Sequence, residues 1–312
     1  MHSLTIGNRT LAWGERTYVM GILNLTPDSF SGDGLLSSVP LSPFPAGEER
    51  LFSPLPPLPL GDGPGVSVAR RFLAAGVDIL DLGGESTRPG SQLVEAEEEL
   101  RRVIPTIRAI AAEFPEALIS IDTYKAVVAE AALQAGACIV NDVWGLRADA
   151  RLAGVIARHE AAVVLMHNRS KPANVEVRER LGKAYQGAQY GNLLEEVRRE
   201  LMESVAIARS AGIPDEHIIL DPGIGFGKTV GQNLELIDRL DEIRALGFPV
   251  LIGPSRKSFI GYTLDLPPDQ RMEGTAAAVA IGIARGADIV RVHDVEALLR
   301  VARMSDAIIR RK

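Results

Sequence analysis

The pattern of apolar and polar residues along the chain repeats one unit eight times. Each unit is a short apolar run that ends at turn residues and is followed by a longer amphipathic stretch. The runs are aliphatic on both faces, which is typical of strands buried on both sides of a parallel sheet. The expected strands are residues 18–24, 77–83, 118–123, 137–142, 161–167, 217–223, 248–253 and 287–294.

The stretches between these runs carry the period and the end signals of helices. Residues 95–114 begin with acidic side chains, which the amino terminus of a helix favours. Residues 192–212 end in Gly212, a common residue after a helix, and residues 272–287 and 294–309 complete the series. Strands that alternate with helices predict a parallel sheet, and eight such units in 312 residues predict a closed (β/α)8 TIM barrel.

An open, doubly wound sheet is the alternative arrangement of the same elements. Dinucleotide-binding sheets of that kind carry G-x-G-x-x-G directly after their first strand, whereas "LTPDSF" follows here. We therefore expect a single domain over residues 1–312 whose barrel core begins at about residue 17.

A proline-rich insertion is expected at residues 34–65, in the loop after the first strand. Residues 40–64 hold eight of the 19 prolines, so this loop should be stiff and pack outside the barrel mouth or across a neighbouring subunit. Its "SPLPPLPL" stretch also leaves open a PxxP ligand for a partner module.

Composition narrows the class of protein. Hydrophobic residues make up 46% and charged residues 24% of the chain, as in ordinary globular proteins. The net charge of −6 gives no general attraction to nucleic acid or to an anionic membrane. The single cysteine, Cys138, excludes an internal disulfide and lies in an apolar run. With no signal-peptide pattern at the start and no apolar run of membrane-spanning length, a cytoplasmic protein is expected.

Polar side chains end nearly every expected strand. In TIM barrels the chemistry lies at these carboxyl ends. One such residue could be a structural polar group with its own partner. A whole set that converges on one face indicates a polar ligand, because burying polar groups without partners costs free energy. The set comprises Asn24, Asp81, Asp122, Asn141, Asp142, His167, Asp221, residues 255–258, Arg291 and His293.

Two loops carry further candidate groups. "GILNLTPDSF" places Asp28 and Phe30 after the first strand, either as a plain turn or as a mobile loop over the barrel mouth. "DLGGESTRPG" offers two glycines that permit close backbone approach and Arg88, which could clamp an anion. "DPGIGFGKT" resembles a phosphate-binding P-loop but has Pro222 where that motif requires glycine.

The last two strands end in cations. Lys257 could form a Schiff base or donate hydrogen bonds to a ring carbonyl. Arg291 and His293 alternate along a strand and therefore share a face, where TIM barrels commonly bind phosphate. The sequence has no histidine and cysteine cluster of the kind that binds zinc. A hard cation such as Mg²⁺, held mainly by a diphosphate, remains open.

Eight collinear motifs resemble those of the dihydropteroate synthase family of pterin-binding barrels. The resemblance runs from the first strand to the last helix, except for the proline-rich insertion and for residues 170–192, whose contacts are not carried over. The motifs are "GILNLTPDSFS", "DLGGESTRPG", "SIDT", "NDVWG", "LMHNR", "LDPGIGFGKT", "GPSRKSFIG" and "GTAAAVAIGIARGADIVRVHDV".

The resemblance implies an enzyme of folate biosynthesis. It would condense 6-hydroxymethyl-7,8-dihydropterin diphosphate with 4-aminobenzoate to form 7,8-dihydropteroate and release diphosphate, through a dissociative, cation-like step without a protein nucleophile. It also implies Mg²⁺, a cytoplasmic location and a homodimer.

The resemblance also implies four groups of site residues. Those for the pterin are Asp122, Asn141, Met166, Asp221 and Lys257. Those for the diphosphate are Asn24, Arg88, Arg291 and His293, with Asn24 also the metal ligand. Those for aminobenzoate are Phe30, Thr87, Pro89, Phe226 and Ser258. The catalytic set is Asp28, Thr87, Arg88, Lys257, Arg291 and His293.

Three other functions stay open at this point. A methyltransferase acting on methyltetrahydrofolate with a corrinoid partner would share the pterin residues but would not need the diphosphate set. A Schiff-base aldolase would use Lys257 as its nucleophile. A non-catalytic protein could display the PxxP motifs or be an inactive paralogue.

Overall fold

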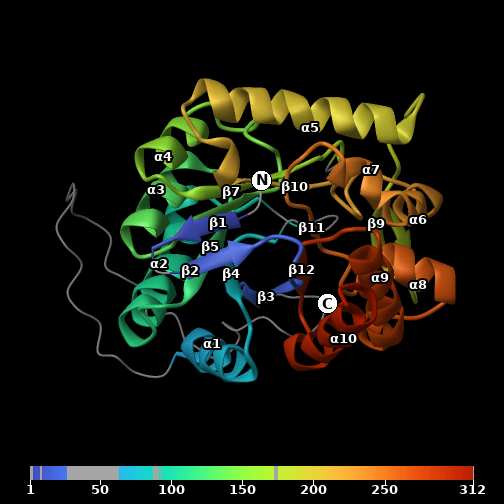
Figure 1. Cartoon of the computed structure of the whole chain (residues 1–312), viewed down its shortest axis with the longest axis horizontal. Coiled ribbons are helices and arrows are strands. Elements are labelled where there is room, and N and C mark those ends of the chain that lie inside the picture. The colour runs from blue at the N-terminus through green and yellow to red at the C-terminus, as the bar shows by residue number, and fades with distance from the viewer. Residues whose placement is uncertain are drawn as a thin grey trace.

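Eight parallel strands form the centre of the molecule and helices surround them (Figure 1). The computed structural model describes residues 3–7, 9–26, 63–86, 91, 93–171 and 175–311. The central strands are β3 (Tyr18–Asn24), β4 (Ile79–Gly83), β5 (Leu118–Asp122), β6 (Ile139–Asp142), β7 (Ala162–Met166), β10 (Ile218–Asp221), β11 (Leu251–Ile252) and β12 (Ile289–Val292).

The order of these strands confirms the TIM barrel. They are hydrogen-bonded as β10-β7-β6-β5-β4-β3-β12-β11, and a parallel bridge between Leu220 and Val250 joins the two ends. The doubly wound alternative is therefore wrong, because such a sheet has two free edges. All eight expected strands are present. β3 has the expected bounds, and each of the other seven is shorter than its apolar run, because those runs extend into the adjoining turns.

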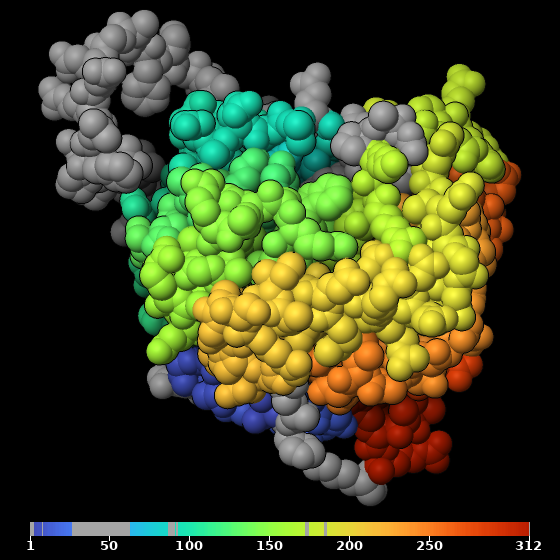
Figure 2. Space-filling view, turned by 90° about the horizontal axis from the view of Figure 1, so that it is seen from above, coloured from blue at the N-terminus to red at the C-terminus, as the bar shows by residue number. Residues whose placement is uncertain are grey.

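Helices fill the connections between the strands. Their bounds are α1 (Pro64–Ala75), α2 (Ala96–Glu113), α3 (Ala126–Gln134), α4 (Leu152–Arg158), α5 (Leu193–Ser210), α6 (Val230–Asp238), α7 (Leu240–Arg244), α8 (Ser258–Leu264), α9 (Met272–Ala284) and α10 (Val295–Ile309), with 3-10 turns at Asp215–His217 and Pro268–Gln270. In Figure 2, α5 forms a band in yellow across the outer surface. None of the described helices is both long and apolar enough to cross a membrane.

The strands divide the apolar residues between two cores. Side chains alternate along a strand, so one half packs outward against the helices and the other half fills the barrel. The inner core includes Tyr18, Met20, Ile79, Leu118, Ile139, Val164, Ile219, Leu251 and Ile289. Further along the same inward rows, toward the carboxyl ends, the side chains become polar. The alternation that fills the barrel therefore also aims the candidate site residues into its mouth.

Two hairpins were not expected from the sequence. The strands β1 (Ser3–Ile6) and β2 (Arg9–Ala12) pair antiparallel, and their Leu4 and Leu11 join the inner core. The phenol of Tyr18 also accepts a hydrogen bond from the backbone N–H of Ala12 at 2.7 Å. The barrel core thus includes residues before position 17.

The second hairpin consists of β8 (Val175–Arg178) and β9 (Gly182–Tyr185), within the stretch whose contacts were not carried over. It packs on α8, where the Tyr262 hydroxyl donates to the Gly182 carbonyl at 3.3 Å. The buried guanidinium of Arg271 donates to the Leu181 carbonyl at 2.7 Å. The hairpin is thereby attached to the loop and helix that follow β11.

The expected insertion lies almost entirely outside the described residues. Its last two residues, Pro64 and Gly65, are instead the first two of α1. Proline suits this position because the first helical N–H needs no partner within the helix. The insertion therefore ends before residue 64.

Candidate active site

An ion network of residues from four strands, β4, β5, β6 and β12, occupies the barrel mouth. Arg291 on β12 donates from Nε to Oδ2 of Asp81 and from Nη2 to Oδ2 of Asp122, each at 2.6 Å. Asn141 on β6 donates from Nδ2 to the same oxygen of Asp81 at 3.2 Å. Because adjacent parallel strands place these residues on inward rows, the barrel itself brings them together. Asp122, Asn141 and Arg291 thus share one site, as expected.

Asp81 belongs to the expected set of strand-end residues, but the sequence assigned it no specific role in binding. Sequence alone places it at a strand end without a binding role, yet its buried carboxylate joins Arg291 to Asn141. Its inward direction could have been read from the alternation along β4, since it stands two residues after Ile79 of the inner core. Its partner Arg291 could not have been read from the sequence, because only closure of the barrel brings β12 close to β4.

Several acceptors in this network are left without partners. Among the described residues, no hydrogen bond reaches Oδ1 of Asp81, Oδ1 of Asp122 or Oγ of Ser120, although all three atoms are buried. Burial raises the pKa of Asp122 to about 7, against the opposing effect of Arg291. Buried acceptors without donors cost free energy, so this mouth suits a ligand that presents N–H groups.

Asp221 lies at the carboxyl end of β10, and Lys257 lies in the loop after β11. Asp221 lies beside Met166 in register, accepts from the Gly223 N–H at 2.7 Å and has a pKa raised by burial. Lys257 directly precedes α8 and donates from Nζ to the carbonyl of Ile224. Burial lowers the pKa of Lys257 to about 8. All five residues expected to bind the pterin therefore come from the carboxyl side of the barrel.

Two of the four expected anion residues line a groove between β3, α1 and α10, whereas Arg291 is bonded to Asp81 and Asp122 and is not part of its lining. Asn24 and His293 both line it, together with Arg256 and Arg300. His293 contacts Oγ of Ser255 through its backbone N–H at 3.2 Å and through Nδ1 at 3.1 Å, which holds the ring in place. The walls carry three arginines and one histidine against two carboxylates, Asp294 and Glu296, so the basic side chains outnumber the acidic ones and the groove can accept an anionic group.

Two of the expected aminobenzoate residues can be placed. Ser258 is the first residue of α8, as its proposed role at a helix start requires. Phe226 lies with its ring centroid 4.5 Å from Nζ of Lys257. Five expected site residues lie outside the described residues, and these are Asp28, Phe30, Thr87, Arg88 and Pro89.

The described part of the barrel mouth offers few ligands for Mg²⁺. They contain no group of three or more histidine, cysteine, aspartate or glutamate side chains that could hold a metal ion. Asn24 supplies one neutral amide oxygen at the wall of the groove. Mg²⁺ commonly takes few protein ligands and completes its shell with phosphate oxygens and water. Asn24 would hold such a cation only together with diphosphate oxygens and water, so the Mg²⁺ site stays a prediction.

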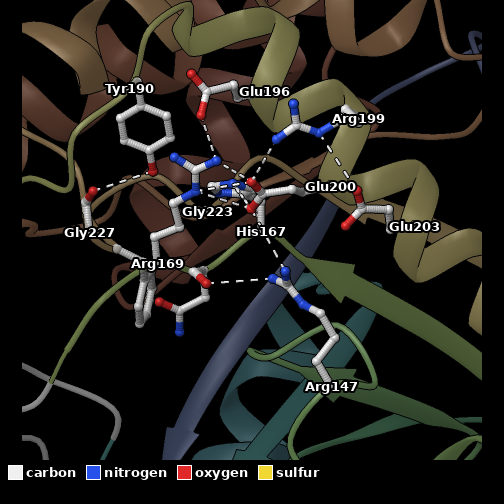
Figure 3. Close-up of polar contacts among 12 residues, drawn as sticks. Arg147, His167, Arg169, Tyr190, Glu196, Arg199, Glu200, Glu203, Gly223 and Gly227 are labelled. Atoms are coloured by element: carbon white, nitrogen blue, oxygen red, sulfur yellow. Dashed lines mark hydrogen bonds and ion pairs between the residues drawn. The ribbon is translucent and has the colours of Figure 1, made fainter.

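His167 stands at a strand end but faces away from the barrel mouth. It follows inward-facing Met166, so its ring points outward toward α5, where Nε2 lies 3.1 Å from Oε2 of Glu200. Arg169 also binds Glu200, and its guanidinium lies 4.4 Å from the Tyr190 ring centroid (Figure 3). This histidine is thus part of a buried polar network behind the site.

The fold and the mouth together define a TIM-barrel enzyme that binds a hydrogen-bonding ligand beside a cationic groove. The family described as pterin binding enzyme matches residues 64–293. Dihydropteroate synthases from Clostridium beijerinckii and Bacillus subtilis are each 44% identical to the chain, over 99% and 96% of it and over 100% and 91% of those proteins.

Solved structures give the same result. The dihydropteroate synthase of Clostridium difficile, solved in the presence of pteroic acid, is 44% identical with a TM-score of 0.77, covering 96% of this chain and 99% of that one. The Yersinia pestis dihydropteroate synthase, solved as a sulfonamide drug complex, is 34% identical with a TM-score of 0.83, covering 99% and 100%. The chain belongs to the dihydropteroate synthase family of pterin-binding enzymes.

Proposed function

We propose that the chain condenses 6-hydroxymethyl-7,8-dihydropterin diphosphate with 4-aminobenzoate, forming 7,8-dihydropteroate and releasing diphosphate. One observation carries this proposal: a buried carboxylate oxygen of Asp81 and one of Asp122, which have no hydrogen-bond partner among the described residues, lie beside Arg291 in a barrel of this family. A pterin presents the amino and ring N–H groups that such acceptors require.

The polar set matches the edge of a pterin group by group. The carboxylates of Asp122 and Asp221 accept hydrogen bonds from the pterin. Asn141 already donates its Nδ2 to Asp81, so its amide oxygen is the group available to a ligand. Lys257 donates to a ring carbonyl, and Met166 packs against the ring face. Each polar role follows from the donor or acceptor that the side chain can still offer.

Departure of the diphosphate starts the reaction. The bond between the pterin methylene carbon and the diphosphate oxygen breaks, and its electron pair leaves with diphosphate. Arg291, His293 and Arg88 neutralise the charge that develops there. Mg²⁺ bound with the diphosphate through Asn24 would add further positive charge to the same oxygens.

The methylene cation that remains is stabilised by the electron-rich dihydropterin ring. The amino nitrogen of 4-aminobenzoate attacks the carbon and then loses a proton, with Asp28 as the proposed acceptor. Phe226, Ser258, Phe30, Thr87 and Pro89 hold the aminobenzoate in place. Catalysis thus consists of positioning and charge stabilisation, without a covalent enzyme intermediate.

A diphosphate-release assay with both substrates and Mg²⁺ tests the proposed function. We expect release that requires the enzyme and both substrates, together with formation of dihydropteroate. A folded protein that released no diphosphate above the blank would refute the proposal.

Replacement of Asn24 by alanine should weaken the response to Mg²⁺. Loss of one amide oxygen is expected to raise the Mg²⁺ concentration for half-maximal rate about tenfold, while the metal keeps its diphosphate ligands. The measurement is a Mg²⁺ titration of diphosphate release. Asn192→Ala, which removes a surface helix cap at α5, is the matched control and should leave the titration unchanged. An unchanged titration in Asn24→Ala would remove Asn24 from the metal site.

We also propose a cytoplasmic homodimer. The helices α9 and α10 pack on each other and expose Ile281, Met304 and Ile308, which are 50%, 61% and 52% accessible. Exposed apolar side chains of this kind are typical of association surfaces. The charged substrates of the proposed reaction support a cytoplasmic location, because they do not cross membranes unaided. Light scattering of the purified chain, with twice the monomer mass expected, tests the dimer.

A further inference from the structure

A buried lysine that the proposed mechanism does not use lies against the loop after β10. Lys228 is 3% exposed. Its Nζ lies 3.0 Å from the carbonyl oxygens of Gly223 and Phe226 and 3.1 Å from Nδ1 of His167. Burial lowers the pKa of Lys228 to about 7, and in its ammonium form the three hydrogens meet three acceptors. Lys228 ties both ends of the segment 223–226 to one point.

His167 connects this lysine to α5. Its Nε2 faces Oε2 of Glu200, so Nε2 carries the hydrogen and Nδ1 is the acceptor for Lys228. Burial, with the nearby charge of Lys228, lowers the pKa of His167 to about 4 and keeps the ring neutral. Glu200 is held in turn by Arg169, which also binds Glu196 at 2.6 Å (Figure 3). Lys228 is therefore positioned by His167, Glu200 and Arg169, which lie outside the barrel mouth.

The loop that Lys228 holds also contacts Lys257, the proposed pterin donor. The Ile224 carbonyl accepts from Nζ of Lys257, and the Phe226 ring packs under the same ammonium group. Gly225 has φ +84, and a Cβ added there would lie 2.6 Å from Cδ of Lys257. The lysine stem thus runs directly along the loop backbone, and a shift of the loop would move Lys257.

We propose that Lys228, oriented by His167 and Glu200, is a positioning residue that acts on the pterin through Lys257. It fixes the loop so that Ile224 and Gly225 hold Lys257 where it donates to the ring. This inference rests on the proposed function, because it assumes that Lys257 binds the pterin. On this inference, Lys228, His167 and Glu200 together increase the affinity for the pterin. They leave the rate of the chemical step nearly unchanged.

A double-mutant cycle on the full chain tests this role. The dissociation constant of 7,8-dihydropterin is measured by calorimetry for the unsubstituted chain, Lys228→Met, Lys257→Met and the double variant. Lys228→Met should weaken binding about tenfold, and the KM for the pterin diphosphate should rise equally while kcat stays within about threefold. In the Lys257→Met background, adding Lys228→Met should cause no further loss of pterin affinity, because Lys228 is proposed to act only through Lys257.

The outcomes separate the inference from a merely structural role. A lysine that only stabilised the loop would lower the melting temperature and weaken binding by the same factor in both backgrounds, and that result would overturn the inference. Wild-type affinity in Lys228→Met would overturn it too. Failure of the unsubstituted chain to bind the pterin would instead count against the proposed function.

Two further variants complete the design. Lys171→Met removes an exposed lysine and should leave affinity and KM unchanged. If Lys228→Met does not fold, Glu200→Gln takes its place in the cycle, since it keeps the side-chain shape and removes the charge that orients His167. Its expected effect is about threefold, again absent from the Lys257→Met background. A threefold loss that persists there would overturn the inference in the same way.

Discussion

Replacement of Arg291 by alanine is expected to lower kcat/KM for diphosphate release by about a thousandfold or more. Arg291 carries the positive charge nearest to Asp81 and Asp122, and it is proposed to stabilise the departing diphosphate. Removing one pre-positioned donor of this kind from a buried site typically costs a factor of about 10²–10³, and here a full charge is lost as well. The measurement is steady-state diphosphate release under saturating Mg²⁺.

The same change should destabilise the free protein. Without Arg291, two buried carboxylates remain close together with no cation bonded to either, and breaking a buried ion pair costs roughly 3–5 kcal/mol in the free energy of unfolding. Pterin binding should therefore weaken as well, because repulsion from Asp81 favours protonation of Asp122. The geometry thus gives Arg291 a second task beside the diphosphate one expected from sequence.

Two variants make the test of Arg291 specific. Arg285→Ala breaks an exposed pair with Asp238 and should change neither turnover nor stability appreciably. Arg291→Lys keeps the charge but cannot bridge both carboxylates, so it should recover part of the stability and little of the rate. Activity of Arg291→Ala within tenfold of the unsubstituted chain would contradict the proposed role.

The fold could be predicted from local sequence patterns because every barrel strand is marked by its own aliphatic run. Each strand is buried on both faces, so an aliphatic run marks it regardless of its neighbours. The β8–β9 hairpin carries no such run, since its strands expose Val177 and Arg178. The β1–β2 hairpin buries only alternate side chains of two four-residue strands, too short a pattern to distinguish from a loop.

A site residue could be predicted from the sequence where its place at the end of a strand is enough to put its side chain in the barrel mouth. Asp122, Asn141 and Asp221 needed only the alternation and the rule that barrel sites lie at carboxyl ends. The bridging role of Asp81 was not predictable, because its partner Arg291 lies 210 residues away and barrel closure creates the contact. Lys228 was hidden for a related reason. Two of its three acceptors are backbone carbonyls, which every sequence has.

Pterin affinity should rise with pH up to about 7 through the ionisation of Asp122. Burial raises the pKa of this carboxyl to about 7 in the free protein, so below that pH it is largely protonated. The proposed pterin N–H donors need the ionised acceptor, and binding must first remove the proton. The dissociation constant should therefore fall roughly a hundredfold between pH 5 and pH 8.

Above about pH 8 affinity should decline again, because burial lowers the pKa of Lys257 to about 8 and its donor charge is then lost. Calorimetric titration of 7,8-dihydropterin from pH 5 to pH 9 measures both limbs. Lys257→Met should remove the upper limb and keep the lower one. If the rise in affinity below pH 7 disappeared in Lys257→Met, its assignment to Asp122 would be wrong.

Asp122→Asn isolates the carboxylate itself. The amide removes the charge but keeps the shape, and its NH₂ group cannot accept from the pterin, so affinity at pH 7.5 should fall about a hundredfold. The rise in affinity between pH 5 and pH 7 should vanish with it, and any pH dependence that remains reports the ligand's own protonation. Arg291 donates to Asp122, and the ionised form of Asp122 is proposed to accept from the pterin, so this carboxylate would connect the proposed diphosphate site to the proposed pterin site. A variant that bound as tightly as the unsubstituted chain at every pH would separate the two sites and move pterin recognition away from β5.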